Sequence, residues 1–288
     1  MVPKMLNRMR VIAALAFFPG LIPSQSIRAQ YLDHARIQHS NSWATVVAND
    51  SIPLFQAIYA VRLEYGWQIN WESAPSYSHF DLVDVTDSEW RAAHPYEKGA
   101  TRPSGGLFTG TFPEPKEASD PDAERLVLEK LIQEYNATDN PGKYVLRVDS
   151  DGQFTVVGTR VRGETGALQE IRPLLDTPVT LAKEPRNVHD AIKSILSTLE
   201  SATGRKVIFA AASSSLFMTT QVTMGGERVP ARELLRQALA ATKQPIQYGL
   251  FFNPDVPVYV LNVSPAMKAE SDGHGGERLA PVDRVAKP

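Results

Sequence analysis

The alternation of strand-like and helix-like segments in residues 177–263 constrains the fold more than any other feature of this chain. The order is strand, helix, strand, strand, helix, strand, strand. Its first helix is predicted from Val188, Ile192, Ile195 and Leu199, which recur at helical spacing and form one apolar face. Short strands alternating with helices of this length predict a small α+β unit with a mixed sheet.

Residues 43–162 repeat this order, interrupted by an insertion at residues 72–106. Gly66-Trp-Gln-Ile-Asn-Trp71 and Gly204-Arg-Lys-Val-Ile-Phe209 share the pattern Gly-x-x-aliphatic-x-aromatic, and each follows a helix that contains an Ala-Ile pair. We interpret the chain as two tandem βαββαββ units of the α+β class with mixed sheets. The alternative is that alternating strands and helices resemble one another by default.

The remaining segments are predicted from their composition. Residues 163–176 are expected to form a linker between the two units. Residues 264–288 contain few apolar residues and much Gly, Pro and charge, so we expect a disordered tail.

The N-terminal residues 1–29 have the organisation of a secretory signal peptide. Lys4, Arg8 and Arg10 precede an apolar run that is too short to span a bilayer, and Ala29 ends an acceptable cleavage site. The alternative, a membrane anchor, needs a longer apolar core. We therefore expect an exported protein that is periplasmic, outer-membrane associated or extracellular, with no transmembrane segment after signal removal.

Composition excludes several classes of function. The chain has no cysteine, so disulfides, thiol nucleophiles and Cys-ligated metals are excluded. The formal charge of −2 falls to about −6 when the four positive residues of the signal are removed, which argues against nucleic-acid binding, since that binding is driven by Lys and Arg. The glycine and serine clusters match no phosphate loop or nucleophile elbow, so no cofactor and no enzymatic activity are expected.

Five segments of residues 177–263 carry a family resemblance: Val188-His-Asp-Ala-Ile192, Gly204-Arg-Lys-Val207, Val222-Thr-Met224, Arg232-Glu-Leu-Leu-Arg-Gln-Ala-Leu239 and Tyr259-Val-Leu261. With them the unit resembles the secretin and TonB short N-terminal (STN) domain family, and residues 43–162 resemble a degenerate copy. The resemblance implies a periplasmic module for protein–protein contact at the mouth of outer-membrane channels and receptors. No β-barrel or secretin domain follows here, so the family's usual membrane partner is not expected within this sequence.

The insertion contains the densest set of potential ligands and acid–base groups, His79, Asp81, Asp84 and His94. A metal-assisted hydrolase would require these side chains to converge at short range over a cleft. The alternative is a solvated acidic loop with helix caps.

Trp67 and Trp71 lie at even spacing on one predicted strand, so their side chains should share a face. Core packing is the ordinary role of such a pair, and an exposed platform for a small ligand such as a sugar or peptide is the alternative. The preferred hypothesis is a non-enzymatic module that recognises another envelope protein through open sheet edges. An oligomer is also possible.

Overall fold

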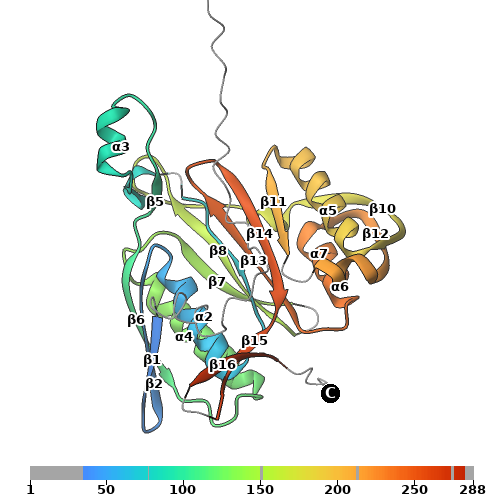
Figure 1. The fold of residues 1–288 in the computed structure, drawn as a ribbon, viewed down its shortest axis with the longest axis horizontal. Coiled ribbons are helices and arrows are strands. Elements are labelled where there is room, and N and C mark those ends of the chain that lie inside the picture. Colours follow the sequence, from blue (N-terminus) through green and yellow to red (C-terminus); the bar gives the residue numbers. More distant parts are fainter. Residues whose placement is uncertain (1–34, 77, 150–151, 212–213, 274–275, 283–288) are drawn as a thin grey trace, which may run out of the picture.

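Helices and strands alternate along both halves of the chain in the computed structural model (Figure 1). The structure describes residues 35–76, 78–149, 152–211, 214–273 and 276–282. The predicted signal peptide lies outside these residues. Within them, no helix combines the length and the apolar character needed to cross a membrane.

The first half forms a three-stranded antiparallel sheet, β1-β2-β6, and contributes three strands to a second sheet, in which β3 runs parallel to β8 and β7 antiparallel to it. Pro53 occupies the first turn of α2, and Gly66 ends that helix in the left-handed conformation. The elements are β1 (Ala35–Ser40), β2 (Trp43–Asp50), α2 (Pro53–Tyr65), β3 (Ile69–Glu72), β6 (Gly106–Pro113), α4 (Pro121–Asn136), β7 (Lys143–Val148) and β8 (Phe154–Arg162).

The second half repeats these pairings: β10 is antiparallel to β12, β11 parallel to β14 and β13 antiparallel to β14. Asn187 caps α5 through the amide of Asp190, and Gly204 ends the helix in the left-handed conformation. The elements are β10 (Pro178–Asn187), α5 (Val188–Thr203), β11 (Val207–Ala211), α6 (Ser214–Thr219), β12 (Gln221–Pro230), α7 (Ala231–Ala240), β13 (Ile246–Asn253) and β14 (Val258–Pro265).

One continuous sheet joins the two halves, with the strand order β11-β14-β13-β3-β8-β7 and the short strand β9 (Leu168–Glu170) beside β8 (Figure 1). The joint is the parallel pairing of β13 with β3, where Gly249 faces Trp71 and Leu250 faces Glu72. Across it, the amide of Ser73 donates to the carbonyl of Leu250 at 2.8 Å.

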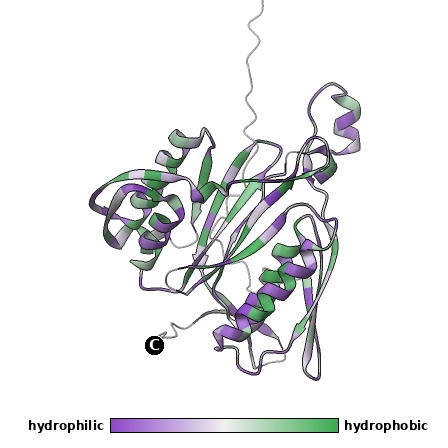
Figure 2. Ribbon diagram, turned by 180° about the vertical axis from the view of Figure 1, so that it is seen from behind, coloured by the Kyte–Doolittle hydropathy of each residue, from purple (hydrophilic) through white to green (hydrophobic). Residues whose placement is uncertain are grey.

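The two hydrophobic cores lie on opposite faces of this sheet. Neighbouring residues of a strand point to opposite faces of the sheet. Leu250 is paired with Glu72, so its side chain lies on the face opposite to that of Trp71. Trp71 belongs to the core under α2 and α4, and Leu250 to the core under α5 and α7. Figure 2 shows hydrophobic residues along the central strands and mixed hydropathy on the helices that cover them.

The equivalence of the two halves extends to a segment without gaps, in which residues 127–148 match residues 231–252. Thr138 and Thr242 illustrate it, since each hydroxyl donates at 2.7 Å to the carbonyl three residues earlier. The internal duplication stays a prediction that these matches support. The identical pairs are Glu129/Glu233, Leu131/Leu235, Gln133/Gln237, Ala137/Ala241, Thr138/Thr242, Pro141/Pro245, Tyr144/Tyr248 and Leu146/Leu250.

Two segments depart from the predictions made from composition. The expected linker, residues 163–176, contains β9 and the 3-10 helix Leu174–Asp176. The expected disordered tail is ordered from residue 264 to 273 and from 276 to 282, where it completes β14 and forms the hairpin β15 (Met267–Ser271) and β16 (Glu277–Pro281) beside α2. The amide of Val282 donates to Ala266 at 2.9 Å and closes the base of this hairpin.

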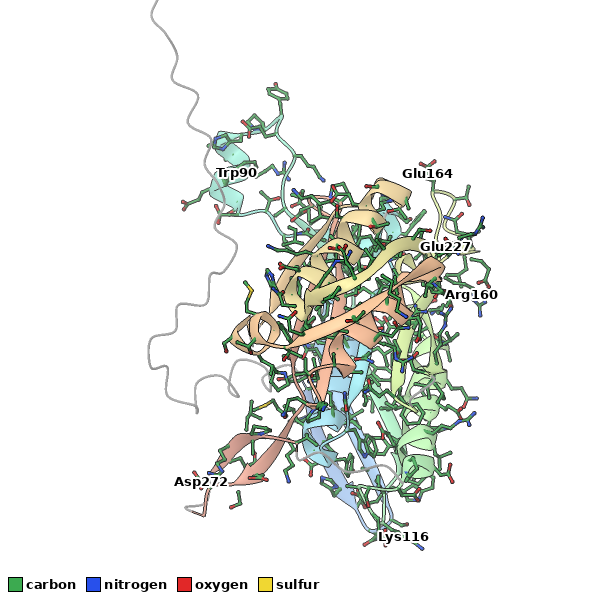
Figure 3. All side chains as sticks on the ribbon, turned by 90° about the vertical axis from the view of Figure 1, so that its right-hand side faces the viewer. Trp90, Lys116, Arg160, Glu164, Glu227 and Asp272 are labelled. Carbon is green, nitrogen blue, oxygen red and sulfur yellow. The ribbon has the colours of Figure 1, made fainter. Side chains whose placement is uncertain are left out.

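The insertion of the first half forms a projecting arm. It contains the 3-10 helix His79–Asp81, β4 (Leu82–Asp84), α3 (Ser88–Ala93) and β5 (Thr101–Pro103). Figure 3 places Trp90 on this arm and Asp272 on the β15–β16 hairpin, at opposite ends of the view. At its base, the hydroxyl of Thr101 donates to Asp255 at 2.7 Å, so the arm is fixed to the turn between β13 and β14.

Candidate interaction surface

Both tryptophans predicted as a possible ligand platform lie in the core. Trp67 is 3% exposed and Trp71 1% exposed. The indole N–H of Trp67 donates to the carbonyl of Ala118 at 2.7 Å, and that of Trp71 donates to the hydroxyl of Ser73 at 2.9 Å. The platform hypothesis is therefore wrong, and the alternative of core packing is correct.

The four polar residues of the insertion do not converge. Asp81 is buried and faces Arg162, with 3.5 Å between Oδ1 and Nε, whereas His79 lies against the exposed Phe80 in a tilted ring contact. Burial raises the pKa of Asp81, and the charges of Arg162 and Lys143 partly offset that shift.

Asp84 and His94 lie further out on the arm. Asp84 accepts from the hydroxyl of Thr86 and from Arg91, whose Nη2 lies 2.6 Å from Oδ2, and these bonds lower the pKa of this exposed carboxyl. His94 stacks on Trp90 with 4.6 Å between ring centroids. No group of three or more His, Asp or Glu side chains suited to a metal occurs in the described residues, so the convergence that the alternative of a metal-assisted hydrolase requires is not found there.

A buried ionic cluster lies on the face of the joint that α7 covers. Arg232 of α7 binds Glu72 of β3 through two hydrogen bonds of 2.6 Å, and the hydroxyl of Tyr248 donates to the same carboxylate at 2.8 Å. Arg232 also contacts Asp176, which Arg147 binds at 2.7 Å. Burial raises the pKa of Asp176, but the two arginines outweigh it, and the net pKa is lowered. These charges satisfy one another, which fits a structural clamp between the two halves.

An open groove of about 560 Å³ runs between α4 and the edge strand β7. Apolar side chains, including Ile132 and Leu146, lie beside polar groups of α4. Val145 and Val148 on the strand are 37% and 53% exposed. The groove is lined by Glu129, Ile132, Gln133, Asn136, Ala137, Tyr144, Val145 and Leu146.

The outer edge of β7 has no strand partner among the described residues. Along a strand of an antiparallel pair, the backbone N–H and C=O groups of every second residue bond to the neighbouring strand, and those of the residues between face the other side. The backbone groups of Tyr144 face away from β8, since its N–H donates to Asn136 Oδ1 at 2.9 Å and its carbonyl accepts from Asn136 Nδ2 at 2.8 Å. By the same alternation, the backbone groups of Leu146 and Val148 face outward.

The sequence predictions did not include this surface. The signal that identifies it is the match between residues 127–148 and 231–252, which makes β7 the equivalent of β13. In the second half, β3 fills the place beside β13. In the first half, the same place beside β7 is the groove.

Neither the protein-family models, nor the curated proteins, nor the solved structures contain a match to this chain.

Proposed function

We propose that this protein is an exported, non-enzymatic interaction module of the bacterial cell envelope, which binds an extended protein segment along the outer edge of β7. The observation that carries this proposal is the outer edge of β7, which no strand of the described residues pairs with, beside an open groove that is partly apolar. The STN-like pattern of residues 177–263 and the signal-like residues 1–29 support a periplasmic or outer-membrane setting.

Strand addition fits the chemistry of this surface. An incoming strand gains affinity from main-chain hydrogen bonds and specificity from pockets for alternate side chains. The outward backbone groups of Leu146 and Val148 supply the hydrogen bonds. Ile132 supplies an apolar contact in the groove, and Glu129 and Gln133 form its polar rim.

A photo-crosslinking amino acid at Val145 tests the proposal in the intact envelope. We expect crosslinked protein adducts from this position, and few from Val256, which is exposed in the turn between β13 and β14, away from β7. Absence of any protein adduct at Val145, in cells where fractionation finds the protein in the envelope, would contradict the proposal.

The arm is a second exposed surface, on which Tyr96 is 99% exposed and Trp90 and His94 are stacked. His79, Asp84 and His94 stay predicted partner contacts there, and a crosslinker at Tyr96 tests them. Adducts from Tyr96 alone would move the partner site from the β7 edge to the arm.

A further inference from the structure

We infer that the strand accepted by β7 is β11 of a second copy of this chain, so that copies join head to tail in one continuous sheet. This inference rests on the proposed role of β7 as a strand acceptor and names its partner. It starts from the two outer edges of the sheet, β7 and β11, since each pairs with one strand only in the described residues.

The joint inside the chain is the template for this contact. There, β13 of the second half pairs in parallel with β3 of the first. By topology, β7 is the equivalent of β13, and β11 is the equivalent of β3. The free edges of β7 and β11 are therefore the equivalents of the β13 and β3 edges, which pair within the molecule.

The template fixes a register. Gly249 and Leu250 face Trp71 and Glu72. The equivalents are Val145 and Leu146 on β7, and Phe209 and Ala210 on β11. The expected neighbours across this parallel contact are Val145 with Phe209 and Leu146 with Ala210.

Asn136 does not obstruct this register. At the inner joint, the N–H of Tyr248 donates to a side-chain amide, Asn70 Oδ1, at 3.0 Å. The equivalent N–H of Tyr144 already donates to the side-chain amide of Asn136. The outward groups of Leu146, equivalent to those that Leu250 uses at the inner joint, stay open for the incoming strand.

The side chains of the proposed β7–β11 contact differ in polarity from those at the equivalent positions of the inner joint. At the inner joint α7 presents Arg232 and Arg236, and β3 presents Asn70 and Glu72. In the sequence match, α4 carries Leu128 and Ile132 at the arginine positions, and β11 carries Ile208 and Ala210 at the polar positions. Ile208 is 46% exposed. Ile208 of β11 therefore offers exposed apolar surface where the inner joint is polar, and Ile132, Val145 and Leu146 line the groove that would receive it. Leu128 is fully buried in the core of its own half and takes no part in the contact.

The contact is heterologous, because β7 of one copy meets β11 of the next. Such contacts form rings where the rotation closes and open filaments where it does not. Each added copy leaves one β7 edge and one β11 edge exposed. We expect an average mass that rises with protein concentration.

Two variants that each block one edge test the direction of assembly. Val145→Lys places a charge on the β7 edge, and Ile208→Lys places one on β11. Analytical ultracentrifugation should show the wild-type chain self-associating, each variant alone as a monomer, and their equimolar mixture as a dimer that grows no further. Val256→Lys, on an exposed turn, should associate like the wild type.

A wild-type chain that stays monomeric at every accessible concentration would overturn the inference, as would a dimer formed by Ile208→Lys alone. Circular dichroism confirms that each variant is folded. Because the chain has no other cysteine, a mixture of Val145→Cys and Phe209→Cys chains provides a second measurement, with an oxidised dimer expected only in the mixture. If Val145 crosslinks to other envelope proteins while the chain stays monomeric, the inference fails and the proposed function stands.

Discussion

Glu72 and Arg232 carry the largest concentration of buried charge at the joint. The burial of both side chains means that removing one leaves the other as an uncompensated charge. We expect Arg232→Met to lower the free energy of unfolding by about 3–5 kcal/mol, the range measured for broken buried pairs. The double variant Glu72→Met/Arg232→Met should recover a large part of that loss. Urea denaturation of the three proteins measures both effects, and a loss below about 1 kcal/mol for the single variant would contradict the clamp.

Asp176 gives the same cluster a defined pH dependence. Its pKa is lower in the folded chain than in the unfolded chain, because Arg147 and Arg232 outweigh the effect of burial. A carboxyl with a lowered pKa contributes stability above its unfolded pKa and loses that contribution as the pH falls through its folded pKa. Between neutral pH and the acidic end of the Asp range, the wild type should therefore lose more stability than Asp176→Asn does. The free energy of unfolding is measured by urea denaturation at a series of pH values. If it changes equally with pH in the wild type and in Asp176→Asn, Asp176 does not cause the pH dependence.

At the scale of elements, Asn136 links the end of α4 to the edge of β7. Its amide satisfies both outward backbone groups of Tyr144. Asn136→Ala removes both bonds, so we expect a loss of about 1–2 kcal/mol in the free energy of unfolding. Asn136→Asp is the matched control, since it keeps an acceptor for the Tyr144 N–H but sets a carboxylate oxygen against the Tyr144 carbonyl at the C-terminal end of α4. At neutral pH its loss should be at least as large as that of Asn136→Ala, and it should become smaller when acid protonates the new carboxyl. A loss that does not change with pH would assign the effect to helix packing.

Elements with local signals were predictable from the sequence. Gly66 and Gly204 end α2 and α5 in the left-handed conformation, and both ends follow from glycine chemistry. The hairpin β15–β16 was not predictable from composition, because its order depends on packing beside α2, far away in sequence. Likewise, β9 is a strand because it pairs with β8 and not because of its own residues.

The joint was the hardest feature to foresee at the scale of the whole molecule. In β3, Trp71 belongs to a core that its own half builds, and the apolar spacing indicates that face. Asn70 and Glu72 on the other face read as solvent-exposed residues of a half-buried strand. They are buried because β13 and α7 of the other half cover them. Only the pairing of distant segments shows that the groove beside β7 is equivalent to the site beside β13 that β3 occupies.

The joint also predicts how the molecule unfolds. Two units joined by a linker would melt separately, whereas one continuous sheet with a shared ionic cluster should melt as a unit. We expect a single calorimetric transition for residues 30–288, with equal calorimetric and van't Hoff enthalpies. The measurement is best made on Val145→Lys, in which self-association is blocked. Arg232→Met serves as the control, since it should lower the midpoint of the whole transition or split it at the joint. Two separate transitions in the protein with an intact cluster would show that the halves fold independently and that the shared sheet contributes little to their stability.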